Sequence, residues 1–175
     1  MNEVINCILH RRSIRSFTES PLSDVQLEII LKAATHAPSG KNIQTWRFTA
    51  INNREKIETL QKISEQVLLS KNEKLHGFYH PRIIILASND RKNPNGLADC
   101  SCALQNIFLA AASLGIGSCW INGLKNICDE PEIRTFLSEL DVPESHIVYG
   151  AASLGFPQQE PAPRLIKTNA IKIIE

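Results

Sequence analysis

The sequence has almost no excess of one charge and no long hydrophobic run. Lys and Arg number 19 against 18 Asp and Glu, which gives a formal net charge of +1 and no global attraction to nucleic acid or to an anionic membrane. The longest apolar stretch, residues 107–114, contains Ser113 and is far too short to span a bilayer. We therefore expect neither a nucleic-acid partner nor a membrane partner, and any phosphate must be recognised by a local cluster of charges.

The cysteines do not form an even set, and the first residues lack the basic region and apolar run of a secretory signal. An odd number of cysteines without a signal indicates reduced thiols in the cytoplasm. Cys100 and Cys102 stand two apart in a predicted helix, so their sulfurs should point to opposite faces and not to a shared metal. The histidines show no metal spacing, and we predict no metal site. The five cysteines are Cys7, Cys100, Cys102, Cys119 and Cys128.

The glycine motifs that bind nucleotides are also missing. Residues 115–120 begin with Gly-x-Gly, but Trp120 stands where a third glycine would be, and the glycines follow a predicted helix instead of opening one. There is no phosphate-binding Gly-x-x-x-x-Gly-Lys-Ser/Thr, and no nucleophile with a recognisable base. A protein whose bound cofactor performs the chemistry needs none of these groups, because its own residues supply binding, orientation and charge.

What is present indicates a globular domain. At 175 residues, with 43% hydrophobic and 21% charged residues, the chain suits a single domain over residues 1–175. Apolar spacing and capping residues predict helices after Asn2, from Ser23 to before Pro38, after Asn53, and over residues 98–114 and 131–140. Strands are expected over residues 46–51, 82–87, 118–121 and 147–152. Helices and strands alternate only partly, so we predict the α+β class, with a mixed sheet packed by helices on both faces.

Two segments have the residues of a ligand site. In the arginine segment (residues 11–15), Arg11, Arg12 and Arg15 surround Ser13, and guanidinium groups match the oxygens of a phosphate in geometry and charge. The polar loop (residues 37–46) joins a predicted helix to a predicted strand and is rich in short polar side chains. The arginine segment could instead be a solvated basic turn without a ligand. The polar loop could be an ordinary connection between a helix and a strand.

Four segments, in the same order along the chain, resemble signatures of the flavin-dependent nitroreductases. They are Arg11-Arg12-Ser13-Ile14-Arg15, Ala37-Pro38-Ser39-Gly40-Lys41-Asn42-Ile43-Gln44-Thr45-Trp46, Leu114-Gly115-Ile116-Gly117-Ser118-Cys119-Trp120-Ile121-Asn122-Gly123, and Gly155-Phe156-Pro157 with Pro161-Ala162-Pro163-Arg164. The resemblance implies a nitroreductase-like three-layer α/β/α sandwich with a central mixed, mostly antiparallel sheet. It also implies an intertwined homodimer, in which residues 158–175 form a tail that docks on the partner subunit.

The resemblance further implies FMN at the subunit interface, with NADH or NADPH as the reductant. Hydride would pass through the flavin to nitroaromatic, quinone or similar small acceptors by a ping-pong mechanism, so no side chain is expected to be catalytic. Arg15 is the candidate to stabilise negative charge on the reduced flavin. The implied FMN contacts are Arg11, Arg12, Ser13, Arg15 and Arg164, then Trp120, Asn122 and Gly123 beside the isoalloxazine, and Pro38, Ser39, Asn42 and Gln44 from the other subunit.

The sequence departs from the family pattern at several points. Thr45 stands where the family usually has proline, and we expect this to loosen the polar loop. The chain is also short for the family, which leaves little room for a segment that covers the substrate. A non-catalytic protein that stores, delivers or senses FMN is therefore an alternative to the enzyme. A nucleic-acid or protein-interaction module is a third interpretation, which the arginine segment alone supports.

Overall fold

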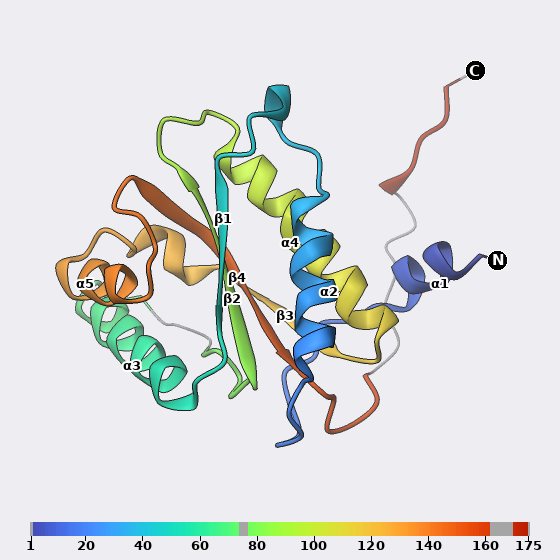
Figure 1. Cartoon of the computed structure of the whole chain (residues 1–175), viewed down its shortest axis with the longest axis horizontal. Coiled ribbons are helices and arrows are strands. Elements are labelled where there is room, and N and C mark those ends of the chain that lie inside the picture. The colour runs from blue at the N-terminus through green and yellow to red at the C-terminus, as the bar shows by residue number, and fades with distance from the viewer. Residues whose placement is uncertain (1, 74–76, 162–169, 175) are drawn as a thin grey trace.

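A four-stranded antiparallel sheet forms the centre of the molecule, in the strand order β1-β2-β4-β3 (Figure 1). The computed structural model describes residues 2–73, 77–161 and 170–174. The strands are β1 (Trp46–Ile51), β2 (Ile83–Asp90), β3 (Gly117–Ile121) and β4 (His146–Gly155). β2 and β4 lie in the middle and are buried along almost their whole length, as expected for runs of apolar residues covered on both faces.

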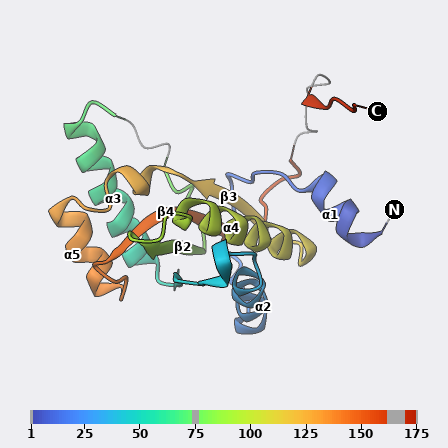
Figure 2. The ribbon, with the colours of Figure 1, turned by 90° about the horizontal axis from the view of Figure 1, so that it is seen from above.

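Helices cover both faces of this sheet, as Figures 1 and 2 show. α3 (Arg54–Ser70) and α5 (Pro131–Glu139) pack on one face, where Ile84 and Leu86 of β2 belong to their core. α2 (Asp24–Thr35) and α4 (Gly96–Ser113) pack on the other face, where the core includes Ile83 and Ile85. Successive strand residues point to opposite faces, so one apolar strand contributes to both cores. The predicted α+β class and the three-layer arrangement are confirmed, and all strand pairs of the described part are antiparallel where a mixed, mostly antiparallel sheet was expected.

The helix starts follow their capping residues. Asn2 accepts a hydrogen bond from the backbone N–H of Ile5 and begins α1 (Glu3–His10), and Asn53 caps α3 in the same way through Lys56. Ser23 and Gln26 form the predicted capping box of α2. Cys100 is buried in α4 and Cys102 is exposed, which confirms that their side chains lie on opposite faces.

Two of the central strands are longer than predicted. β2 continues to Asp90 and β4 runs from His146 to Gly155, although Asn89 and Asp90 are residues typical of turns. The backbone groups at Asn89 pair on both sides, with Trp46 of β1 and with Ile147 of β4, and this pairing outweighs the local turn preference.

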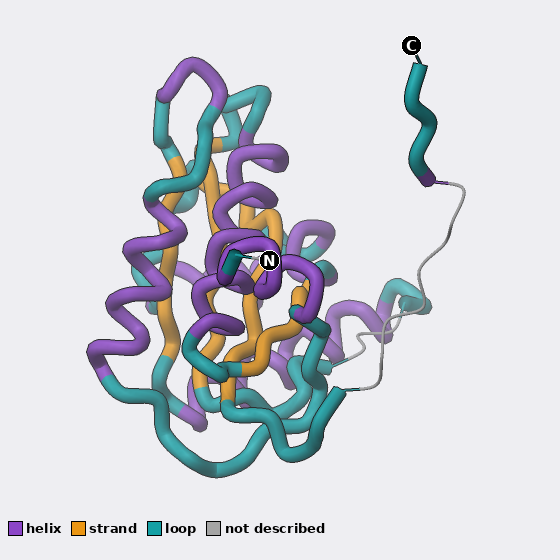
Figure 3. The backbone as a smooth tube through the Cα atoms, turned by 90° about the vertical axis from the view of Figure 1, so that its right-hand side faces the viewer, coloured by secondary structure: helices purple, strands orange, loops and turns teal. Residues whose placement is uncertain are grey.

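The C-terminal segment of the described chain lies apart from the body (Figure 3), and α1 lies at one side of it in Figures 1 and 2. α1 has no buried residue, and its apolar side chains remain exposed; they are Val4, Ile5, Ile8 and Leu9. Near the other end, Ile171, Ile173 and Ile174 are more than 80% exposed and belong to no strand, so docking of the tail on a partner stays a prediction. No helix of the described part is long and apolar enough to cross a membrane.

Candidate functional site

The arginine segment lies along β3. The backbone N–H of Ile14 donates to the carbonyl oxygen of Ser118 at 2.9 Å, and Ser13 forms a parallel bridge with Ser118. Ile14 is buried, while Ser13 and Arg15 on either side of it are exposed, as expected for an extended chain. A Cβ atom on Gly117 would come within 2.9 Å of three Ile14 atoms, so the glycine permits this close approach. Packing of Ile14 against β3 therefore directs the side chains of Ser13 and Arg15 toward solvent.

Two aromatic rings support the arginines. The guanidinium carbon of Arg11 lies 5.7 Å from the ring centroid of Phe108, and that of Arg15 lies 5.7 Å from the ring centroid of Tyr79. Burial raises the pKa of the neighbouring Cys119 thiol, and the positive charges of Arg15 and Arg11 offset this effect only in part. Cys119 therefore remains a protonated thiol near neutral pH, which does not suit a nucleophile.

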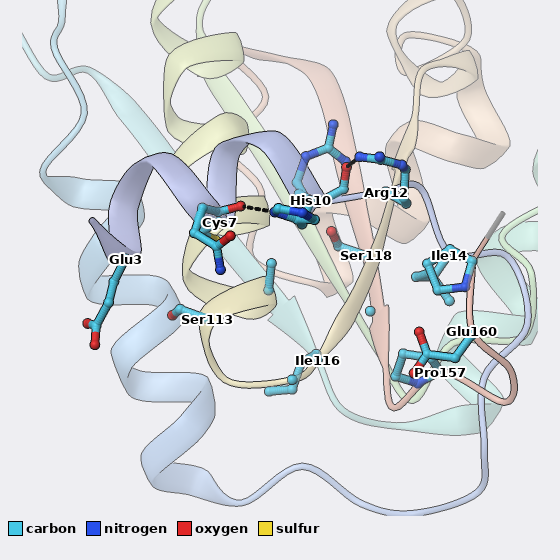
Figure 4. Close-up of a pocket in the computed structure, with 16 residues that line it drawn as sticks. Glu3, Cys7, His10, Arg12, Ile14, Ser113, Ile116, Ser118, Pro157 and Glu160 are labelled. Atoms are coloured by element: carbon cyan, nitrogen blue, oxygen red, sulfur yellow. Dashed lines mark hydrogen bonds between the residues drawn. The ribbon is translucent and has the colours of Figure 1, made fainter. Parts of the chain in front are cut away.

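A cavity of about 620 Å³ lies between α1, the end of α4, the start of β3 and residues 157–161 (Figure 4). Its volume falls within the usual range of ligand pockets. Arg11, Arg12 and Ser118 are among the residues that line it. Arg12 donates through Nη1 to the carbonyl oxygens of Leu9 and Arg11, each at 2.8 Å.

Two buried polar atoms of the cavity-lining residues lack a hydrogen-bond partner within the described part of the chain. They are Nε of Arg12 and Oγ of Ser118. A buried donor without a partner costs free energy, so such atoms indicate a missing ligand or subunit. A guanidinium donor beside a hydroxyl suits a phosphate or a polyhydroxyl chain, which are the groups that FMN would present there.

Trp120 brings a flat apolar surface to the same region. Its indole tilts against the ring of Phe108 at a centroid distance of 5.9 Å, and it is 36% exposed. Gly150 makes room for the indole, because a Cβ atom there would lie 2.9 Å from Nε1 of Trp120. Arg11 and Trp120 thus contact the same phenylalanine. Asn122 and Gly123 follow directly, where β3 ends and the 3-10 helix η2 (Gly123–Asn126) begins.

The polar loop lies elsewhere on the subunit, over the start of α4. The backbone N–H of Gly40, in the 3-10 helix η1 (Gly40–Asn42), donates to Oδ1 of Asp99 at 2.9 Å. Asp99 precedes Phe108 by nine residues on α4, a separation of about 14 Å along the helix axis. One chain therefore does not bring the loop to the arginine segment.

Within the loop, the predicted contact residues present short polar groups. Pro38, Asn42 and Gln44 are exposed, and Nε2 of Gln44 donates to Oδ1 of Asn42. Oγ of Ser39 is buried and has no hydrogen-bond partner within the described part of the chain. Of the twelve predicted FMN contacts, Arg164 lies outside the described residues.

The expectation that Thr45 loosens the loop is wrong. Its hydroxyl donates to Oδ1 of Asn89 at 2.7 Å and accepts from Nδ2 of Asn93 at 3.0 Å, so it ties the loop to the end of β2 and to the turn after it. Sequence reasoning also missed Phe108 and Tyr79 as supports of the arginines, because the pairs are distant in the chain. The concentration of Asn and Asp over residues 89–99 was the available signal for the Thr45 contacts.

Comparisons with known proteins agree on one family. A family model described as "Nitroreductase family" matches residues 8–156. A putative NADH dehydrogenase/NAD(P)H nitroreductase of Archaeoglobus fulgidus is 35% identical over 167 residues, which cover 91% of this chain and 88% of that protein. An FMN-bound nitroreductase structure from Bacteroides fragilis has a TM-score of 0.94 and 37% identity, with 100% of both chains covered. An FMN-bound nitroreductase from Desulfitobacterium hafniense gives 0.89 and 27%, again with 100% of both chains covered.

Proposed function

The chain belongs to the nitroreductase family, and from this premise we propose that it is an FMN-dependent NAD(P)H oxidoreductase. Its acceptors are nitroaromatics, quinones or similar small molecules, reduced by a ping-pong mechanism. The observation that carries the proposal is the arginine segment held against β3 beside Trp120, in a fold that matches FMN-bound structures over the full chain. A vibrio NADPH-flavin oxidoreductase, 29% identical over 177 residues, is a further relative.

The residues of the site fit FMN. Arg11 and Arg12, with the unpartnered Nε of Arg12, would hold the phosphate, and Ser13 would contact the ribityl chain. Arg164 would add positive charge there. Trp120 would lie beside the isoalloxazine, with Asn122 and Gly123 at the end of β3 offering backbone N–H groups.

Bound FMN supplies the redox chemistry, taking a hydride equivalent from NADH or NADPH and delivering electrons to the acceptor. The protein binds and orients the cofactor and adjusts its charge environment. Arg15 would place positive charge where the reduced ring system is anionic, and the ring of Tyr79 limits where its guanidinium can lie. No acid or base side chain is assigned, because hydride transfer requires close stacking instead of a proton donor.

We propose a homodimer as the working unit. The polar loop and the arginine segment lie about 14 Å apart along α4 in one subunit, so a second copy is needed to bring Pro38, Ser39, Asn42 and Gln44 to the cofactor. The exposed apolar face of α1 supports an interface, since a short helix with no buried residue gains little from its own chain.

We further propose that residues 1–175 form one FMN-binding domain, with the tail from residue 158 docking on the partner. Two features support this arrangement: the exposed isoleucines at 171, 173 and 174, and the outer edge of β1, which pairs with no further strand of the described residues. An unpaired strand edge accepts another strand. The five free thiols support a reducing compartment, which we take to be the cytoplasm.

An anaerobic reduction experiment tests the function. The purified protein should be yellow, and its bound flavin should bleach when NADH or NADPH is added without oxygen and regain colour with a nitroaromatic or a quinone. Protein that stays colourless after refolding with FMN would contradict the proposal. Bound flavin that neither nicotinamide reduces would favour the non-catalytic alternative, a protein that stores, delivers or senses FMN.

A further inference from the structure

The polar loop is fastened at both ends to the segment that leads into α4. Near its start, Gly40 donates to Oδ1 of Asp99 at 2.9 Å; at its end, the Thr45 hydroxyl donates to Oδ1 of Asn89 at 2.7 Å. Asn93 joins the two ends, since its Nδ2 donates to Oδ2 of Asp99 and to Oγ1 of Thr45, each at 3.0 Å. One amide group has two hydrogens, so Asn93 can make both bonds at once.

The Asn and Asp side chains of this network are buried, while Gly40 and Thr45 are half-buried. Asp99 is 3% exposed, Asn93 7% and Asn89 0%. No lysine or arginine of the described part pairs with Asp99, so hydrogen bonds and the first turn of α4 compensate its carboxylate. A buried polar group that loses its partner is destabilised by its full desolvation penalty. The side chains therefore favour the arrangement that keeps these bonds, in which Nδ2 of Asn89 alone among their buried polar atoms has no hydrogen-bond partner within the described residues.

The tip of the loop has a backbone that needs such support. Lys41, Asn42 and Gln44 have φ angles of 53°, 56° and 53°, in the left-handed region that residues with a Cβ seldom occupy. Conformations of this kind persist where the surroundings hold them, and they concentrate at ligand contacts. Asn42 and Gln44 are also two of the residues that we assign to the partner's flavin.

We propose that Thr45, Asn93 and Asp99 are positioning residues, which hold Asn42 and Gln44 in the shape that grips FMN across the dimer. The inference rests on the proposed function. None of the three residues is assigned a contact with FMN. Their effect is to preorganise the loop, so that binding does not have to order it.

Replacing Thr45 by valine tests this role. Thr45→Val keeps the shape of the side chain and leaves both Asn89 Oδ1 and Asn93 Nδ2 without the hydroxyl. We expect FMN to bind at least about tenfold more weakly, mainly through faster dissociation, because two part-buried hydrogen bonds are lost. Thr45→Ser keeps the hydroxyl and should restore affinity. Thr49→Val is the matched control, because Thr49 lies in β1, the strand that begins directly after Thr45, and its hydroxyl makes no hydrogen bond within the described residues.

The readouts separate positioning from stability. FMN dissociation is followed by flavin fluorescence well below the unfolding transition, and backbone amide exchange of residues 40–44 is measured without FMN. Faster exchange with faster dissociation in Thr45→Val supports the inference. A lower melting temperature with unchanged FMN affinity overturns it, and so does an equal effect of Thr49→Val. Wild-type protein that binds no FMN overturns the proposed function as well, whereas normal wild-type binding with an unaffected Thr45→Val overturns the positioning role alone.

Discussion

At the scale of single residues, the site depends on where the arginines are held. Arg11 lies over Phe108 and Arg15 over Tyr79, and each ring restricts a side chain that would otherwise sample many conformations. Preorganised guanidinium groups bind an anion with less loss of entropy than mobile ones. The arginine segment therefore presents guanidinium groups in fixed orientations.

Removing two of these arginines should abolish flavin retention. We expect Arg11→Ala with Arg15→Ala to weaken FMN binding by about 10- to 100-fold per residue, because each loses a charge-assisted hydrogen bond. The flavin-to-protein ratio after gel filtration measures the effect. Arg54→Ala is the control. Arg54 lies on the surface of α3 and forms ion pairs with Glu58 of the same helix and with Glu19. Unchanged flavin content together with lost nucleic-acid binding would instead favour an interaction module.

At the scale of elements, the arginine segment and β3 fit because Gly117 has no side chain. A Cβ atom at this position would lie 2.9 Å from Cβ, Cγ1 and Cγ2 of Ile14, and these atoms cannot swing away as the end of a long side chain could. The contact fixes the spacing between the segment and the strand that carries Trp120.

Gly117→Ala should therefore affect stability and cofactor binding together. We expect a loss of roughly 1–3 kcal/mol in the free energy of unfolding, as overpacking of a close contact typically costs. FMN affinity should also fall, since the segment must move away from β3. Urea unfolding and fluorescence titration measure the two effects. Wild-type values for both would show that the segment does not depend on this contact.

His146 is a buried histidine at the start of β4, where it pairs with the end of β2, and it makes the stability of the fold depend on pH. Burial lowers the pKa of His146, Asp90 opposes this effect, and Arg47 and Arg134 reinforce it; Nδ1 lies 3.1 Å from Oγ of Ser88. The folded state therefore binds the proton more weakly than the unfolded state does. As pH falls below the ordinary value of 6.5, the unfolded chain gains protons first, and stability decreases.

We expect the free energy of unfolding to be lower at about pH 5.5 than at about pH 7.5, by at most roughly 1.4 kcal/mol per pH unit from this group. His146→Gln should flatten that dependence in urea titrations at several pH values. His36→Gln is the control for the same substitution at an exposed position. An unaltered slope in His146→Gln would show that other groups cause the pH dependence.

At the scale of the whole molecule, the two groups of residues that we assign to FMN lie apart in one subunit. The arginine segment lies near the end of α4 and the polar loop lies over its start, so the length of this helix keeps them apart. A symmetric pair of subunits can place the loop of one against the arginines of the other. Cofactor binding and dimerisation should then be linked.

Charges on the apolar face of α1 test this link. We expect Ile5→Glu with Leu9→Glu to weaken dimerisation by roughly a hundredfold or more, because carboxylates would be buried without partners. FMN should be lost with the dimer, while the circular dichroism spectrum stays close to that of the wild type. Sedimentation and flavin content measure this. Leu69→Glu on α3 is the control for an exposed apolar side chain elsewhere. Monomers that retain FMN would contradict the linkage.

The sequence by itself determined the local structure. Caps at Asn2, Ser23 and Asn53 predicted where helices begin, and the apolar runs identified the central strands, because these signals act within a few residues. The four family segments also indicated the cofactor class.

The tertiary structure alone decided which distant residues meet. It paired Arg11 with Phe108, extended β2 through Asn89 against its turn preference, and turned Thr45 from a loosening residue into an anchor. Such contacts depend on how helices and strands pack, and the Thr45 hydroxyl meets its partners only when the end of β2 and the turn after it lie beside the loop. The same packing set the polar loop apart from the arginine segment and so made the second subunit part of the proposed site.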